Sequence, residues 1–155
     1  MLNVTRENRA GLTSVMPVST PQHQAVALAL LRIVTALVFL QHGLQKLIAF
    51  PLPPVPGYQH WSLAGLAGVM EVVASPLLAV GLYIRSTSFV MSGLMAVAYF
   101  MGHGHKGFFP LANGGDVAVL CCFIFLYLAA AGGGAWTLDA WRARAYDPQP
   151  VGRRT

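Results

Sequence analysis

Three ionisable side chains in two apolar segments have the types and spacing of a polar pocket between two helices. His42 and Lys46 are four residues apart and therefore share one face of a helix. At about 1.5 Å per helical residue, His42 lies ~12 Å below the end of its segment near Phe50. Glu71 lies ~13 Å below the start of the next segment near Ser62, at a similar depth. A His42–Glu71 hydrogen bond or ion pair is therefore predicted, with Lys46 as a second candidate partner of Glu71.

Pro76 adds to the polarity expected around Glu71. Proline has no amide hydrogen to donate, so it leaves the carbonyl of Val72 unpaired, one residue from the acid. Inserting a charged side chain into the membrane within an apolar segment costs at least ~2.5–3.5 kcal/mol. A cluster of such side chains is therefore expected to have a structural or functional role. Two readings stay open: an ion pair that sets helix register, and a pocket that handles protons or binds a ligand.

A second polar group occupies residues 102–116, GHGHKGFFPLANGGD, between two apolar runs. His103 and His105 could chelate a metal with Asp116, but this spacing is no complete metal signature, and no metal site is predicted. The simpler expectation is that His103, His105 and Lys106 are polar groups at the membrane surface, one of which pairs with Asp116.

Other polar residues are expected to have structural roles. Asn113, Gly114 and Gly115 tolerate the left-handed backbone of a tight turn. Asp116 then falls at a helix start, where a carboxylate complements the helix dipole. Arg32 is expected to snorkel toward one membrane surface or to reach a carbonyl of the bundle.

The elements that position these residues follow from composition. The chain has 155 residues, of which 55% are hydrophobic and 10% charged, whereas soluble domains carry about 25% charged residues. Apolar runs at about 25–50, 62–84, 86–103 and 115–133 approach the ~20 residues that cross a bilayer. The predicted fold is an all-α integral membrane protein, a four-transmembrane-helix bundle over residues 25–141, between a mobile tail at 1–24 and a basic tail at 142–155.

The distribution of basic residues predicts the orientation. Seven arginines lie in the tails and in the 85–87 turn, whereas the opposite loops hold Lys46 and Lys106. By the positive-inside rule both termini are cytoplasmic, and residues 102–116 face outward. The basic residues form no stripe, so no nucleic-acid partner is expected.

Several blocks of the chain resemble the DoxX family of small four-span bacterial membrane proteins. The resemblance covers residues 25–141 and is carried by LLRIVTALVFLQHGLQKL at 30–47, Glu71, GLYIR at 81–85, GFFPLANGGD and GGGAWTLDAW. Asp116 stands where the family commonly has Glu, and Gly132–Gly134 replaces a usual Gly-Pro-Gly. The resemblance implies a multi-pass protein of the bacterial inner membrane with a soluble or membrane-bound redox partner subunit.

The resemblance implies quinone-linked redox work, and the function predicted is an accessory subunit of a quinone-linked oxidoreductase or redox-stress system. A quinone is the candidate ligand of an outer-half pocket formed by His42, Lys46, Glu71 and the 102–116 loop. No nucleophile with an evident base is present, so an oxidoreductase subunit without catalytic activity of its own is the form expected. A small-molecule or proton-coupled transporter and a non-catalytic membrane scaffold remain open as alternatives.

Overall fold

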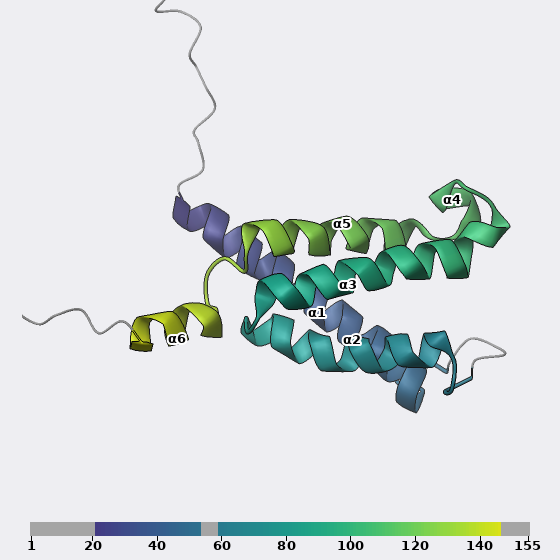
Figure 1. The fold of residues 1–155 in the computed structure, drawn as a ribbon, viewed down its shortest axis with the longest axis horizontal. Helices are drawn as coiled ribbons and strands as arrows, with labels where there is room; N and C mark the ends of the chain where they lie inside the picture. The colour runs from purple at the N-terminus through teal and green to yellow at the C-terminus, as the bar shows by residue number, and fades with distance from the viewer. Residues whose placement is uncertain (1–20, 54–58, 147–155) are drawn as a thin grey trace, which may run out of the picture.

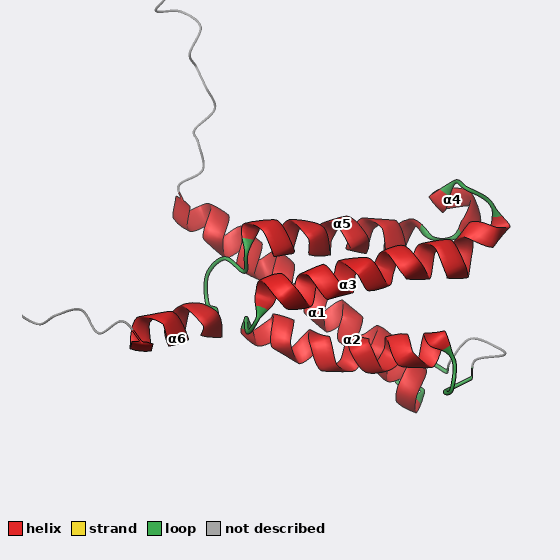
Figure 2. Ribbon diagram, viewed as in Figure 1, coloured by secondary structure: helices red, strands yellow, loops and turns green. Residues whose placement is uncertain are grey.

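The computed structural model describes residues 21–53 and 59–146, and these consist of helices and their connections, without a strand (Figure 2). The elements in chain order are α1 (Pro21–Ile48), α2 (Leu63–Val80), α3 (Ile84–Ala98), the π-helix η1 (Tyr99–His103), the 3-10 helix η2 (Gly104–Lys106), α4 (Pro110–Asn113), α5 (Asp116–Ala131) and α6 (Leu138–Tyr146). Most of the predicted mobile tail at 1–24 lies outside the described residues, as do residues 147–155 of the basic tail.

Two helices begin or extend where the sequence reasoning placed tails. α1 is already helical at Pro21, the first described residue, so it includes the last four residues of the predicted tail. α6 continues to Tyr146, beyond the predicted boundary at 142.

The four long helices share one core. α1 packs along α2, α3 packs along α5, and α2 and α3 are neighbours (Figure 1). The Phe39 ring of α1 meets the Phe125 ring of α5 edge to face, with centroids 4.7 Å apart. The buried residues of this core come from all four helices: Ala36, Phe39, Ala74, Leu78, Met91, Met95, Cys121, Phe125 and Leu128.

The outer faces of the helices are also apolar. Val34, Val73, Phe89 and Phe123 are each at least 57% exposed. In the described part of the chain, three helical segments are long and apolar enough to cross a membrane: α1, α2 and the continuous stretch 84–106. An apolar interior inside an apolar exterior fits a lipid bilayer. α5, at 16 residues, is a shorter apolar helix, so the fourth span and the cytoplasmic termini stay predictions.

The bundle has two distinct ends (Figure 1). What we call the tail end holds the start of α1, the α2–α3 turn and α6, and there the amide of Ala135 donates to the carbonyl of Ala25 at 2.9 Å. What we call the loop end holds the α1–α2 connection and the segment from η1 to α4. Lys46 and Glu71 belong to the half of the bundle nearer the loop end.

Candidate functional site

Two glycines bring α1 and α2 into close contact. A Cβ atom at Gly43 would lie 2.7 Å from Cγ2 of Val72 and 3.0 Å from the carbonyl oxygen of Gly68. A Cβ atom at Gly68 would lie 2.9 Å from Cβ of Lys46. Only glycine fits at either position without a shift, and the resulting approach brings the side chains of Lys46 and Glu71 within reach of each other.

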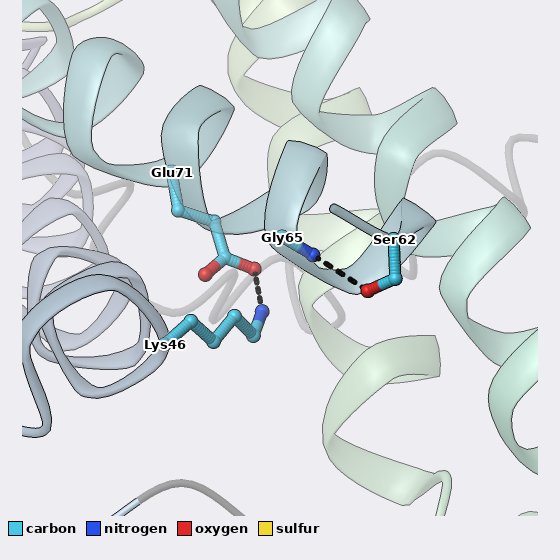
Figure 3. Close-up of polar contacts among 4 residues, drawn as sticks. All are labelled: Lys46, Ser62, Gly65 and Glu71. Atoms are coloured by element: carbon cyan, nitrogen blue, oxygen red, sulfur yellow. Dashed lines mark hydrogen bonds and ion pairs between the residues drawn. The ribbon is translucent and has the colours of Figure 1, made fainter. Parts of the chain in front are cut away.

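Lys46 and Glu71 form an ion pair across this contact (Figure 3). The Lys46 ammonium nitrogen lies 2.5 Å from Oε1 of Glu71. The Glu71 side chain is 2% exposed and that of Lys46 is 28% exposed. Oε2 of Glu71 is buried and receives no hydrogen bond from any described residue. The site is therefore a buried carboxylate with one cationic partner and one acceptor oxygen left over.

The predicted His42–Glu71 hydrogen bond is wrong, and Lys46, the second candidate, is the partner. Gly43 faces α2, which turns the adjacent residue His42 away, so that its side chain is exposed and its ring packs edge-on against Phe39. Helical side chains also lean toward the N-terminus, so Lys46 extends back to the depth of Glu71. His42 still interacts electrostatically with Glu71.

The start of α2 determines how deep Glu71 lies. Ser62 is the N-cap, and its hydroxyl accepts a hydrogen bond from the amide of Gly65 at 3.3 Å (Figure 3). The same hydroxyl donates to the carbonyl of Gln59. A Cβ atom at Gly65 would lie 1.8 Å from the carbonyl oxygen of His60, so the chain can enter the helix this tightly only at a glycine. Glu71 follows Leu63 by eight residues, about 12 Å along the helix.

Pro76 does not interrupt the helix below Glu71. α2 runs from Leu63 to Val80 with Pro76 inside it. The next residue toward Glu71, Ser75, is buried, and its hydroxyl has no hydrogen-bond partner among the described residues.

Asn113 organises the 102–116 loop. It is 4% exposed, and its amide group donates to the carbonyl of Gly107 at 2.7 Å and to the hydroxyl of Tyr99 at 3.3 Å. Its side-chain oxygen accepts the amide of Gly115 at 2.8 Å. The Tyr99 hydroxyl in turn donates to the carbonyl of Phe108. Sequence reasoning expected a turn here and missed that the Asn113 side chain is the centre of a buried network.

The remaining loop candidates do not converge on Glu71. His103 places Nδ1 3.1 Å from the carbonyl oxygen of Asn113, whereas His105 and Asp116 are exposed. α5 begins at Asp116, as predicted, but the predicted pairing of Asp116 with His103, His105 or Lys106 is absent from the described part of the chain. Within residues 21–53 and 59–146, no three His, Cys, Asp or Glu side chains gather as metal ligands.

Arg32 closes the tail end of the bundle. Its side chain is fully buried, and the guanidinium donates to the carbonyls of Gly133 and Trp136, both at 3.0 Å. Of the two expectations for Arg32, snorkelling toward a membrane surface or contact with a carbonyl of the bundle, the structure shows the contact with carbonyls. A Cβ atom at Gly133 would lie 2.0 Å from Cδ1 of Ile84 and 2.7 Å from Nη1 of Arg32, which explains the glycine beside this charge.

Asp139 is a structural residue that sequence reasoning missed. Its carboxylate accepts the amides of Tyr83 and Ile84, at 3.1 and 3.2 Å, and so caps the start of α3 from a distant part of the chain. One signal was available: the residues before α3 include no Ser, Thr, Asp or Asn that could cap it locally.

The fold and its apolar surface define a helical membrane protein. Comparison with known proteins identifies the family: the DoxX family model matches residues 27–104. An uncharacterized protein of Haemophilus influenzae is 44% identical over 117 residues, which cover 72% of this chain and 87% of the relative. No solved structure matches the chain significantly. The chain therefore belongs to the DoxX family, as the sequence blocks predicted, and the matched region includes Arg32, His42, Lys46 and Glu71.

Proposed function

We propose that this DoxX protein is an accessory subunit of a quinone-linked redox system in the bacterial inner membrane. In this proposal the Lys46–Glu71 pair, with His42 beside it, binds a quinone-type headgroup and handles its protons. The observation that carries the proposal is the second carboxylate oxygen of Glu71. Oε1 pairs with Lys46, whereas Oε2 is buried and accepts no hydrogen bond from any described residue.

The chemistry of the pair suits both redox forms of the ligand. A quinol hydroxyl is a donor and matches the free Oε2 of Glu71, whereas a quinone carbonyl is an acceptor and matches the ammonium of Lys46 or the imidazole of His42. Oxidation of a quinol to a quinone releases two protons and two electrons. Glu71 would take the proton of one hydroxyl, the imidazole of His42 would take that of the other, and the two electrons would pass to the redox centre of a partner subunit. The apolar outer faces of α1 and α2 would surround the ligand's tail.

Quinone content tests the proposal. The protein is purified in mild detergent, its lipids are extracted, and bound quinone is quantified by mass spectrometry. Glu71→Gln keeps the shape of the side chain but replaces one acceptor oxygen by an amide NH2 group, which is a donor. This variant is expected to lose most of the bound quinone. His42→Ala is expected to lose a smaller part.

Asp116→Asn is the matched control because it neutralises an exposed carboxylate that makes no ion pair in the described chain. Quinone content should be unchanged in this variant. Equal quinone content in Glu71→Gln and the parent protein would refute the pocket and favour a scaffold. Proton-driven uptake into vesicles that depends on Glu71 would instead favour a transporter.

A further inference from the structure

A groove unrelated to the Lys46–Glu71 site lies at the tail end of the bundle. It has a volume of about 510 Å³, within the range of small-molecule sites of roughly 300–1,000 Å³. It runs between the end of α2, the connection after α5, and α6. The side chains that matter are Val80, Trp136, Leu138 and Trp141, which are apolar or aromatic, and Arg144 at the rim.

A buried arginine and a half-buried aspartate hold the walls of this groove in place. Trp136 has a φ of 54°, a left-handed conformation that is unfavourable for a bulky side chain. Its carbonyl accepts a hydrogen bond from the fully buried Arg32, which fixes that conformation. On the other side, Asp139 ties α6 to the start of α3 through the amides of Tyr83 and Ile84. The groove is therefore shaped before any ligand binds.

The lining of the groove changes from apolar to basic along α6. Its apolar part includes Val80, the last residue of α2, and Leu138, the first residue of α6. Its basic residue, Arg144, follows Leu138 by six residues, about 9 Å farther along α6. α6 lies beyond the ends of α2, α3 and α5, at the level where α1 begins (Figure 1). Trp136 and Trp141 are 65% and 67% exposed, as expected of tryptophans at a membrane interface.

Arg144 is the arginine available to a ligand. The guanidinium of Arg142 lies over the Tyr83 ring, 5.5 Å from its centroid. Arg144 is exposed, lines the groove and makes no ion pair with any described residue. An arginine in this setting complements a phosphate group.

We propose that this groove binds one anionic phospholipid, with an acyl chain against Val80, Leu138 and the two tryptophans, and the phosphate on Arg144. A phospholipid presents apolar tails and then an anionic headgroup, in the same order as the apolar and basic residues of the groove. This site is independent of the proposed quinone function.

Native mass spectrometry of the full chain tests the lipid site. The delipidated protein is offered an equimolar mixture of phosphatidylglycerol and phosphatidylcholine with identical acyl chains. The parent protein is expected to retain phosphatidylglycerol preferentially. Arg144→Gln should lower the ratio of bound phosphatidylglycerol to phosphatidylcholine about fivefold, because one basic residue contributes about that factor to anionic-lipid binding. Trp141→Ala should lower the retention of both lipids.

Lys106→Gln is the control, since it makes the same charge change at the loop end. An equal loss of preference in Lys106→Gln and Arg144→Gln would show a general charge effect and overturn the site. Equal retention of both lipids by the parent protein would also overturn it. Arg144 makes no buried contact, so its substitution leaves the fold intact, and quinone content in this variant should match the parent protein.

Discussion

The ammonium nitrogen of Lys46 lies 2.5 Å from Oε1 of Glu71, and the pair joins α1 to α2 beside a glycine contact. The two partners differ in exposure, 28% for Lys46 and 2% for Glu71, and this difference predicts unequal costs of removing them. Lys46→Met leaves a buried carboxylate without its cation and is expected to lower the free energy of unfolding by about 3 kcal/mol. Glu71→Gln leaves a cation that can turn toward solvent and should cost about 1 kcal/mol.

Unfolding in detergent, followed by circular dichroism, measures both losses. The double variant Lys46→Met/Glu71→Leu replaces the pair by apolar groups and should recover most of the stability lost in Lys46→Met. If the two single variants lost the same free energy of unfolding, the unequal burial of the two partners would not determine the cost of removing them.

The close approach of α1 and α2 predicts that Gly43→Ala is damaging. The added methyl group would lie 2.7 Å from Val72 and 3.0 Å from Glu71 Cβ, so the helices must separate and Lys46 must move away from Glu71. We expect a loss of about 2 kcal/mol, as for other overpacked contacts. Gly93→Ala is the matched control because, apart from the nearby backbone of its own helix, no atom lies within 4 Å of the added methyl group. Alanine also has the greater helix propensity, so stability should be unchanged or improved. Comparable losses in the two variants would argue against the glycine contact.

The Asn113 network predicts local instability at the loop end when it is removed. Asn113→Ala abolishes the hydrogen bonds to Gly107, Tyr99 and Gly115 and leaves buried partners unsatisfied, at a cost of about 3 kcal/mol. Hydrogen exchange should rise in the amides between η1 and α5, and less in α1 and α2. His105→Ala, an exposed neighbour, should have no effect. Unchanged protection of the Gly115 amide in Asn113→Ala would show that the network does not hold the loop.

Cysteine labelling tests the predicted four spans and cytoplasmic termini. Leu111→Cys is a suitable probe of the loop end because Leu111 is 89% exposed, whereas Asn113 is buried. In intact cells, with Cys121 and Cys122 replaced by alanine, a membrane-impermeant reagent should label Leu111→Cys and spare Ser14→Cys. Labelling of both positions would place them on the same side of the membrane, with an even number of crossing segments between them, and would contradict the three predicted spans. Labelling of Ser14→Cys alone would reverse the orientation.

The helices were largely predictable because they depend on local composition. Long apolar runs and breaks at proline and glycine indicated α1, α2 and α3, and the Asn-Gly-Gly turn indicated the start of α5 at Asp116. The level of Glu71 relative to α1 was also predictable, since rise per residue is constant, and a Cβ atom at Gly43 would lie 3.0 Å from Cβ of Glu71. The choice between His42 and Lys46 was not, because it depends on how α1 is rotated, and the contact at Gly43 determines that rotation.

Contacts between distant segments were the other part that local patterns did not predict. Asp139 caps Ile84 from 55 residues away, and nothing near Asp139 in the chain marks its partner. The buried hydrogen bonds of Asn113 were missed for a similar reason. Its side chain donates to the hydroxyl of Tyr99, which lies 14 residues earlier, on a π-helix that apolar periodicity does not reveal.

The hydrogen bond from Arg32 to Gly133 has a consequence for biosynthesis. Arg32 belongs to α1, which leaves the ribosome before the other described helices, and Gly133 is 101 residues later. At about 5–20 residues per second, the carbonyls that solvate this guanidinium emerge roughly 5–20 s after it does. During that interval the nascent α1 carries an uncompensated cation, which must stay near water, a lipid headgroup or the insertion machinery. Stable seating of α1 in the membrane would then be among the last events of assembly rather than the first.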